Sequence, residues 1–391
     1  MVHCADGPDI AGSVASAAAE TSFKRFTSQL FRHLLRADQH RWAQTYLAGL
    51  LVTPGKKSIP RLARSVGSSP STAHALRQFI NVSPWDWKPA LQEIAAWAQE
   101  ESSRACAWSI GRSLQPKRGE QSVGVHPYTD PVSGRIFNCQ VALGMFLTIG
   151  ATPVPTNWRL FLPRSWANDP TRRKRTRIPD TEHHRPLYKH ALELVDSQAQ
   201  HSASVPIVLD MRHDPDVRLL LPALRRRGHR MVIAVPPTLK VRPDDPVREP
   251  VPGVVNARTC VATGPVSEVL VPVGPEGVLR RKRVRSVPVR LPRQQVDPAD
   301  NEPYRLFGEC GPDGGPLSLW VTTFPRHKLA HAASLTALAR CTASVISDME
   351  DSVGLIDFEG RSYPGWYHHM TLASAAYAYS RLVCGATSGG S

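Results

Sequence analysis

The stretch SVPIVLD, residues 204–210, decides the fold. Its apolar run, 205–209, is typical of a strand buried on both faces of a parallel sheet. Asp210 ends that run, and a carboxylate in such a place needs a metal ion, a charged partner or solvent. The alternative uses of Asp210 are a helix N-cap or an ion pair.

The flanking segments alternate between helix and strand. PLYKHALELVDSQ (186–198) and DVRLLLPALRRRG (216–228) have apolar residues at helical spacing, and HRMVIAV (229–235) is strand-like. Earlier in the chain, RACAWSI (104–110), QSVGV (121–125) and IFNCQVALGMFL (136–147) are three strand-like runs separated by turn signals. Three strands, a helix, a strand, a helix and a strand is the order of an α/β fold with a ribonuclease H-like mixed sheet.

The remaining segments divide the chain into further parts. Residues 1–20 are expected to be a disordered tail, and residues 21–100 a helical DNA-binding domain. Within that domain, SIPRLARSVGSSPSTAHALRQF (58–79) resembles a helix-turn-helix with Ser71 as the N-cap of its second helix, although a core-forming helical hairpin fits equally well. Residues 101–235 form the first part of the ribonuclease H-like core, and the Pro-, Gly- and Val-rich 236–325 is expected to be a β-rich insertion. The helical segment 326–391 would complete the core.

The composition favours a polyanionic partner. The formal net charge is +15 with a pI near 9.9, and 38 of the 48 basic residues are arginines, whose planar fork suits phosphate. A GC-rich genome would also raise the arginine content. We therefore expect double-stranded DNA as partner. No apolar run approaches the roughly 20 residues that span a bilayer, so no membrane is expected. The seven scattered cysteines favour the reducing cytoplasm, and with DNA as partner we expect a nucleoid-associated location.

Several motifs occur in the order found in a known family. They are RWAQTYLAGLL, KKSIPRLA, LRQFINVSPWD, KRGEQSVGV, GRIFNCQVAL, RLFLPRSWANDP, IVLD, YRLFGE with LSLWVTT, and GLIDFEGRSYPGWYHHMTL. On these motifs the chain resembles DDE transposases of the insertion sequence 701 family over roughly residues 25–383. The resemblance implies DNA as substrate and strand transfer by two Mg²⁺ ions held by three carboxylates.

Only one of those three acids has a counterpart in this sequence. The family's first aspartate belongs to a pair whose places are taken here by Gly111 and Arg112. Asp210 matches the second acid and is the remaining candidate catalytic residue and metal ligand, whereas Ala343 takes the place of the third. Asp348 and Glu350 are the nearest acids that could stand in for it. The expectation is a transposase-derived DNA-binding protein with impaired catalysis, which needs Mg²⁺ only if it is active.

Basic residues and two histidines are candidates for contacts with DNA. They are Lys56, Lys57, Arg77, Lys117, Arg118, Arg172, Arg173, Lys174, Arg175, Arg280, Arg281, Lys282, Arg283, Arg361, His368 and His369. A working transposase that cuts and joins DNA at terminal inverted repeats is the alternative function, and a remnant without a selected role is a third. A homodimer is among the assemblies left open.

Overall fold

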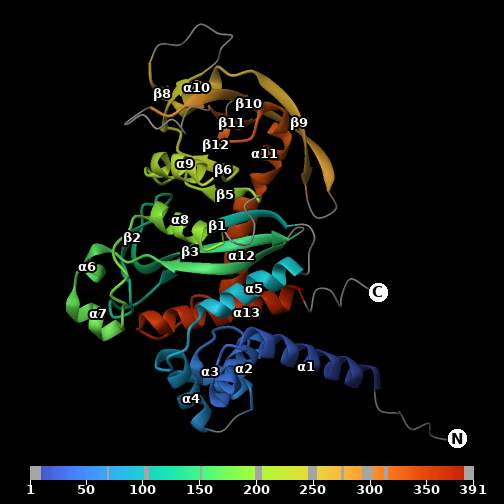
Figure 1. The fold of residues 1–391 in the computed structure, drawn as a ribbon, viewed down its shortest axis with the longest axis vertical. Coiled ribbons are helices and arrows are strands. Elements are labelled where there is room, and N and C mark those ends of the chain that lie inside the picture. The colour runs from blue at the N-terminus through green and yellow to red at the C-terminus, as the bar shows by residue number, and fades with distance from the viewer. Residues whose placement is uncertain are drawn as a thin grey trace, which may run out of the picture. The chain divides into compact units, whose positions relative to one another are not determined.

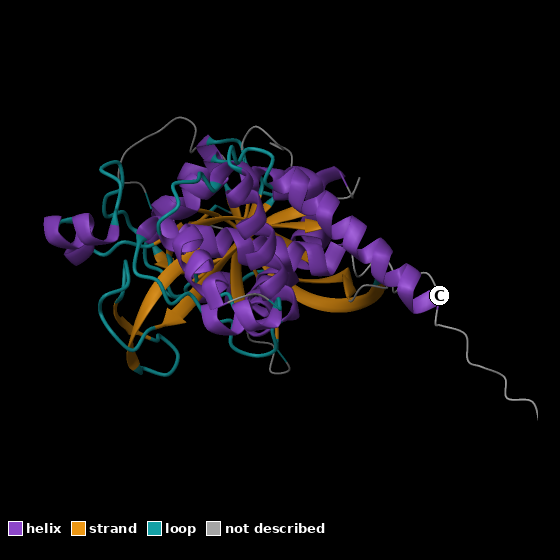
Figure 2. Cartoon of the chain, turned by 90° about the horizontal axis from the view of Figure 1, so that it is seen from below, coloured by secondary structure: helices purple, strands orange, loops and turns teal. Residues whose placement is uncertain are grey.

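The computed structural model describes residues 10–67, 70–100, 105–149, 152–198, 205–244, 253–273, 277–292, 303–311 and 316–382. The described residues fall into two compact units. The first, here called the helical unit, takes those within 1–96, 349–360 and 364–391. The second, the sheet unit, takes those within 97–348 and 361–363. Figure 1 gives the element labels, and Figure 2 shows that both helices and strands are plentiful.

The N-terminal helices pack through apolar side chains. They are α1 (Ile10–Leu30), α2 (Ala37–Val52), α3 (Ile59–Ser65), α4 (Pro70–Asn81) and α5 (Lys88–Glu100). Their buried residues include Leu30, Leu47 and Leu62. The turn between α3 and α4 passes through Gly67, whose φ of 68° suits glycine. The predicted helix-turn-helix order is therefore present.

One sheet of twelve strands organises the sheet unit. Its strands are β1 (Ala105–Pro116), β2 (His126–Thr129), β3 (Ile136–Ile149), β4 (Thr152–Leu160), β5 (Ile207–Asp210), β6 (Met231–Val235), β7 (Lys240–Pro243), β8 (Val255–Asn256), β9 (Val266–Val273), β10 (Val278–Arg290), β11 (Tyr304–Cys310) and β12 (Pro316–Thr322). The helices of this part are α6 (Arg164–Ala167), α7 (Pro170–Thr176), α8 (Leu187–Asp196), α9 (Val217–Arg226), α10 (Ala257–Ala262), the 3₁₀ turn η2 (Arg326–Lys328), α11 (Leu329–Leu335) and α12 (Ala337–Val353).

The strand pairing confirms the expected fold class. The core order is β4-β3-β1-β5-β6, with β4, β3 and β1 antiparallel and β5 and β6 parallel to β1. This is a ribonuclease H-like mixed sheet. The insertion extends the same sheet, because β12 pairs antiparallel with β6 and continues into β11 and β10. Residues from this extension, such as Phe307 and Trp320, share one core cluster with Val208 and Val232.

Two strand expectations were wrong in detail. QSVGV is a turn, because Gly124 has a φ of 77° that breaks the extended backbone, although Val123 and Val125 are buried. The third long strand of the core is β4 instead, whose prolines had hidden it. Among the described strands β4 pairs only with β3, and such an edge position tolerates proline.

The ends of the chain also differ from expectation. Residues 10–20 are helical, since α1 begins at Ile10 in an alanine-rich run of high helix propensity. Residues 1–9 lie outside the described part. Ser71 lies inside α4 rather than at its N-cap, because that helix begins at Pro70. The last helix, α13 (Tyr363–Leu382), groups with the helical unit instead of completing the sheet core.

The helical stretch Arg326–Val353 has the length and mean hydropathy, 1.3, of a membrane span. The sequence analysis predicts no membrane-spanning segment. In the structure 44% of that window is buried, and Leu329, Ala332 and Ala333 belong to the core cluster of the sheet unit. A core helix meets the same length and hydropathy criteria, so this stretch packs as part of the protein interior.

Candidate active site and nucleic-acid interface

Asp210 lies at the carboxyl end of β5, on the sheet face covered by α11. It pairs with Ala234 in the register with β6, and by strand alternation it shares a face with Val208, which is in the core cluster with Ala332 of α11. Its side chain is 39% exposed. Both of its oxygens contact the Arg212 guanidinium, at 2.9 Å from Nε and 2.8 Å from Nη2, and the Arg212 amide donates to it as well. Asp210 is thus an ion-paired carboxylate.

The expected place of the first acid is closed by α12. The parallel register ends at Ile110–Leu209, so the next residue of β1, Gly111, lies beside Asp210. A Cβ atom on Gly111 would lie 2.6 Å from Cδ1 of Ile346 and 2.8 Å from Cγ2 of Thr342. The Thr342 hydroxyl is also hydrogen-bonded to Ser109 at 2.6 Å. A carboxylate at position 111 has no room in this packing.

Arg112, the second residue of the lost acid pair, lies on the other face of β1 from Gly111. Neighbouring strand residues point to opposite faces, so Arg112 points away from the face on which Gly111 meets α12. Its guanidinium donates to the Tyr128 hydroxyl at 3.3 Å. Burial raises the pKa of Asp214, and the positive charge of Arg112 opposes that shift.

The third acid position is equally unsuited to a metal. Ala343 is exposed on α12, whereas Thr342 and Ile346 of the same helix are buried against β1. Burial, together with the nearby charge of Asp351, raises the pKa of Glu350. Among the residues that the structure describes, no group of three or more His, Cys, Asp and Glu side chains could hold a metal ion. The residues present therefore do not fit a pair of Mg²⁺ ions.

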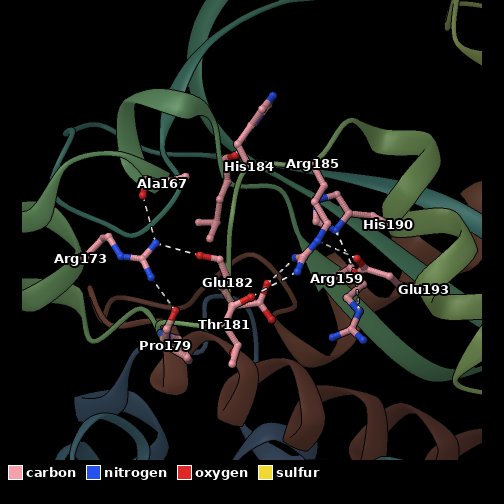
Figure 3. Close-up of polar contacts among 11 residues, drawn as sticks. Arg159, Ala167, Arg173, Pro179, Thr181, Glu182, His184, Arg185, His190 and Glu193 are labelled. Carbon is pink, nitrogen blue, oxygen red and sulfur yellow. Dashed lines mark hydrogen bonds and ion pairs between the residues drawn. The ribbon is translucent and has the colours of Figure 1, made fainter.

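The basic run 172–175 is divided between structure and surface. Arg173 holds its loop together, since its guanidinium donates to the carbonyl oxygens of Ala167, Pro179 and Glu182 at 2.7–3.1 Å. Figure 3 shows this fork, which corrects the prediction of a DNA contact for Arg173. Lys174 and Arg175 are exposed on α7.

The base of α7 is fixed by further ionic contacts. Arg172 stacks 4.9 Å from the ring centre of Trp166 and pairs with Asp169, whose side chain caps α7 by accepting from two backbone amides. Beyond the helix, Arg185 bridges Glu182 and Glu193 at 3.0 Å each. Figure 3 shows Arg185 with Glu182 and Glu193. The network presents Lys174 and Arg175 on a rigid support.

Two of the three basic candidates in the helical unit stay at the surface. Lys57 is buried, its amide donates to Asp357 at 2.7 Å, and its ammonium donates to the carbonyl of Thr53. Burial lowers the pKa of Lys57, so it does not act as a surface cation. Lys56 is exposed and pairs with Glu359 at 3.2 Å. Arg77 is exposed on α4.

His368 and His369 are enclosed rather than facing DNA, at 1% and 0% exposure. The ring nitrogens of His368 lie 2.8 Å and 2.9 Å from the carbonyl oxygens of Ile80 and Trp85. His369 contacts the Tyr46 hydroxyl at 3.0 Å and the Gly354 carbonyl at 2.9 Å. Both histidines fix α13 within the helical unit, which removes them from the candidate DNA contacts.

The other candidates lie in the sheet unit. Arg118 and Arg361 are exposed, and Lys117 is half-buried. On β10, Arg280, Arg281 and Arg283 are exposed, whereas Lys282 pairs with Glu309. The sequence analysis missed exposed side chains near two of the cations. His74 and Gln78 are near Arg77 on α4, and Leu270 and Leu279 are near Arg281 on the β9–β10 hairpin. Helical spacing from Arg77 is the signal for His74, and strand alternation from Arg281 is the signal for Leu279; neither signal reaches Gln78 or Leu270.

Comparison with known proteins places the chain in a family. Residues 29–259, more than half of the chain, match the model described as DDE superfamily endonuclease. The chain belongs to this DDE superfamily endonuclease family. Enzymes of this family typically use divalent metals.

One solved structure similar to this DDE superfamily member is the piggyBac transposase synaptic complex with hairpin DNA, determined by cryo-EM. The match has a TM-score of 0.40 and 11% sequence identity, and it covers 90% of this chain and 67% of that one. No curated protein matches the sequence.

Proposed function

We propose that this protein binds double-stranded DNA and does not cut it, and that it derives from a transposase of the insertion sequence 701 family. The observation that carries the proposal is the closed position at Gly111, where Ile346 and Thr342 fill the space that a carboxylate would need. Asp210 alone, already paired with Arg212, cannot supply the charge that two dications require.

The distribution of charge supports DNA as the partner. The net charge is +15, and exposed cations lie on several separate elements, among them Arg77 on α4, Lys174 and Arg175 on α7, and Arg281 on β10. Cations of this kind neutralise phosphates and release counterions, which gives binding without a base-specific contact. We expect the protein to act on chromosomal DNA in the cytoplasm, as a monomer or a homodimer.

A band-shift and nicking assay on the DNA that flanks the gene tests this function. We expect salt-sensitive retention of duplex DNA, with the logarithm of the affinity falling by about 0.9 per neutralised phosphate for each tenfold rise in salt. We expect no nicking with or without magnesium. Magnesium-dependent nicking that disappears in Asp210→Ala would instead establish the alternative, an active transposase.

A further inference from the structure

The β9–β10 hairpin forms a two-stranded ribbon in the sheet unit. Val278–Arg283 of β10 pair with Glu268–Val273 of β9, and β11 joins β10 only from Val284 onward. Figure 1 shows the two strands as a long curved ribbon beside α11. Among the described strands, nothing else pairs with β9. The ribbon therefore projects its outer part without a third strand.

The two faces of the ribbon differ in chemistry. Val271 and Val284 point inward and belong to the core cluster that contains Leu329 and Ala332 of α11. Lys282, on the same face, pairs with Glu309. The opposite face, here called the ribbon face, consists of Glu268, Leu270, Leu279, Arg281 and Arg283, all exposed. The packed inner face holds the ribbon face in a fixed geometry, which lowers the entropy cost of binding.

The ribbon face places two arginines next to two leucines, since Leu279 precedes Arg281 on the same face of β10. Arg281 and Arg283 are two residues apart on β10, so their Cα atoms are about 6.8 Å apart. That distance equals two steps along a DNA strand, because the phosphates of one strand follow each other about every 3.4 Å when measured along the helix axis. Leu270 is directly opposite Arg281 across the ribbon. The two arginines therefore suit a phosphate backbone, and the two neighbouring leucines suit the apolar part of a groove.

We propose that the ribbon face docks in the major groove of duplex DNA, which is wide enough for a two-stranded β-ribbon. Arg281 and Arg283 contact phosphates, and Leu270 and Leu279 contact thymine methyl groups, the apolar feature of that groove. This inference rests on the proposed DNA-binding function and assigns it to one surface.

Glu268 limits the affinity of this surface. Its carboxylate lies 3.5 Å from the Arg281 guanidinium, and both side chains are largely exposed, at 62% and 80%. A carboxylate beside a phosphate backbone repels it, and it also competes for Arg281. Glu268→Gln is therefore expected to tighten DNA binding by about twofold to fivefold, the range of an exposed ion pair.

The experiment compares full-length variants on a short fluorescent duplex across a salt titration. Arg281→Ser with Arg283→Ser is expected to reduce the slope of log affinity against log salt by about 1.8, since each lost phosphate contact removes about 0.9. Arg280→Ser is the matched control, because Arg280 has the same charge on the same strand but lies on the opposite face. It is expected to leave the slope unchanged.

A second duplex, with uracil in place of thymine, tests the contacts of Leu270 and Leu279. The wild-type protein is expected to bind it more weakly, and Leu270→Ser with Leu279→Ser is expected to remove that difference. All these positions are exposed, and thermal melts verify that the variants remain folded.

The outcomes separate the two levels of the proposal. Failure of the folded wild-type protein to bind any duplex overturns both the DNA-binding function and the ribbon assignment. Binding that responds equally to the Arg281/Arg283 pair and to Arg280→Ser overturns the ribbon assignment alone. A dimer in gel filtration that dissociates in the Arg281/Arg283 variant, with DNA affinity unchanged, identifies a second copy of the chain as the occupant instead.

Discussion

Substitution of Gly111 by alanine tests the closure of the site directly. The added Cβ would lie 2.6 Å from Cδ1 of Ile346 and 2.8 Å from Cγ2 of Thr342. Carbon atoms pack best at about 3.5–4.0 Å, so α12 or its side chains must move by about 1 Å. Ile346 is buried and β-branched, which leaves it few alternative rotamers.

The expected cost is about 1–2 kcal/mol. Overpacking a core typically costs about 1–3 kcal/mol, and replacing a strand glycine by alanine returns about 0.5–1 kcal/mol of backbone entropy. With a urea m-value of about 2 kcal/mol/M, the unfolding midpoint of Gly111→Ala is expected about 0.5–1 M below that of the wild-type protein.

A double-mutant cycle identifies the atom responsible. Ile346→Val removes Cδ1 and by itself costs about 0.5–1.5 kcal/mol. In the Gly111→Ala background the same change relieves the close contact, so the double variant is expected to be more stable than the sum of the single effects by about 1 kcal/mol. Urea unfolding followed by circular dichroism and fluorescence measures all four proteins. A Gly111→Ala midpoint equal to the wild-type value, with additive effects, would refute the packing of α12 against β1.

Three further predictions follow from the same contacts. Arg173→Ala is expected to lower the free energy of unfolding by about 1.5–3 kcal/mol because it removes charged hydrogen bonds to three carbonyl oxygens, whereas Lys174→Ala leaves unfolding unchanged and weakens DNA binding in a salt titration. The unfolding midpoint is expected not to change with magnesium at constant ionic strength, either in the wild-type protein or in Asp210→Asn. A midpoint that rises with magnesium in the wild-type protein but not in Asp210→Asn would contradict this. Burial lowers the pKa of His229, so the unfolded chain binds the proton more tightly than the folded one. The free energy of unfolding is therefore expected to fall as the pH drops below about 6.5. His229→Gln is expected to flatten this dependence of stability on pH, as measured by unfolding at a series of acid pH values.

The candidate site was accessible to sequence reasoning only in part. The absence of acids at 111, 112 and 343 is a matter of residue identity, so the sequence alone raised the doubt about catalysis. The sequence did not show which residue of the pair Gly111 and Arg112 faces α12; the pairing of β1 with β5 and strand alternation place Gly111 on that face. Motif spacing carries no information about which way a strand faces.

Candidate DNA contacts show the same division. Charge runs predicted where cations cluster, but they could not separate Lys174 at the surface from Arg173 in its carbonyl fork. His368 and His369 belong to one of the motifs on which the sequence resemblance rests, and only the packing of α13 shows that both are interior residues. Conversely, the sequence does not indicate a role for Leu270 and Leu279, and only the register of β9 and β10 shows that they lie beside arginines.

By itself the sequence determined most of the order of helices and strands of the ribonuclease H-like core, although it missed β4, since apolar periodicity and turn residues act locally along the chain. It also determined the DDE superfamily membership and the excess of positive charge. Tertiary structure alone decided that Ile346 fills the space above Gly111, that the insertion extends the same sheet, and that α13 belongs with the helical unit. These outcomes depend on contacts between residues far apart in the chain, and packing geometry, rather than local propensity, sets their energy.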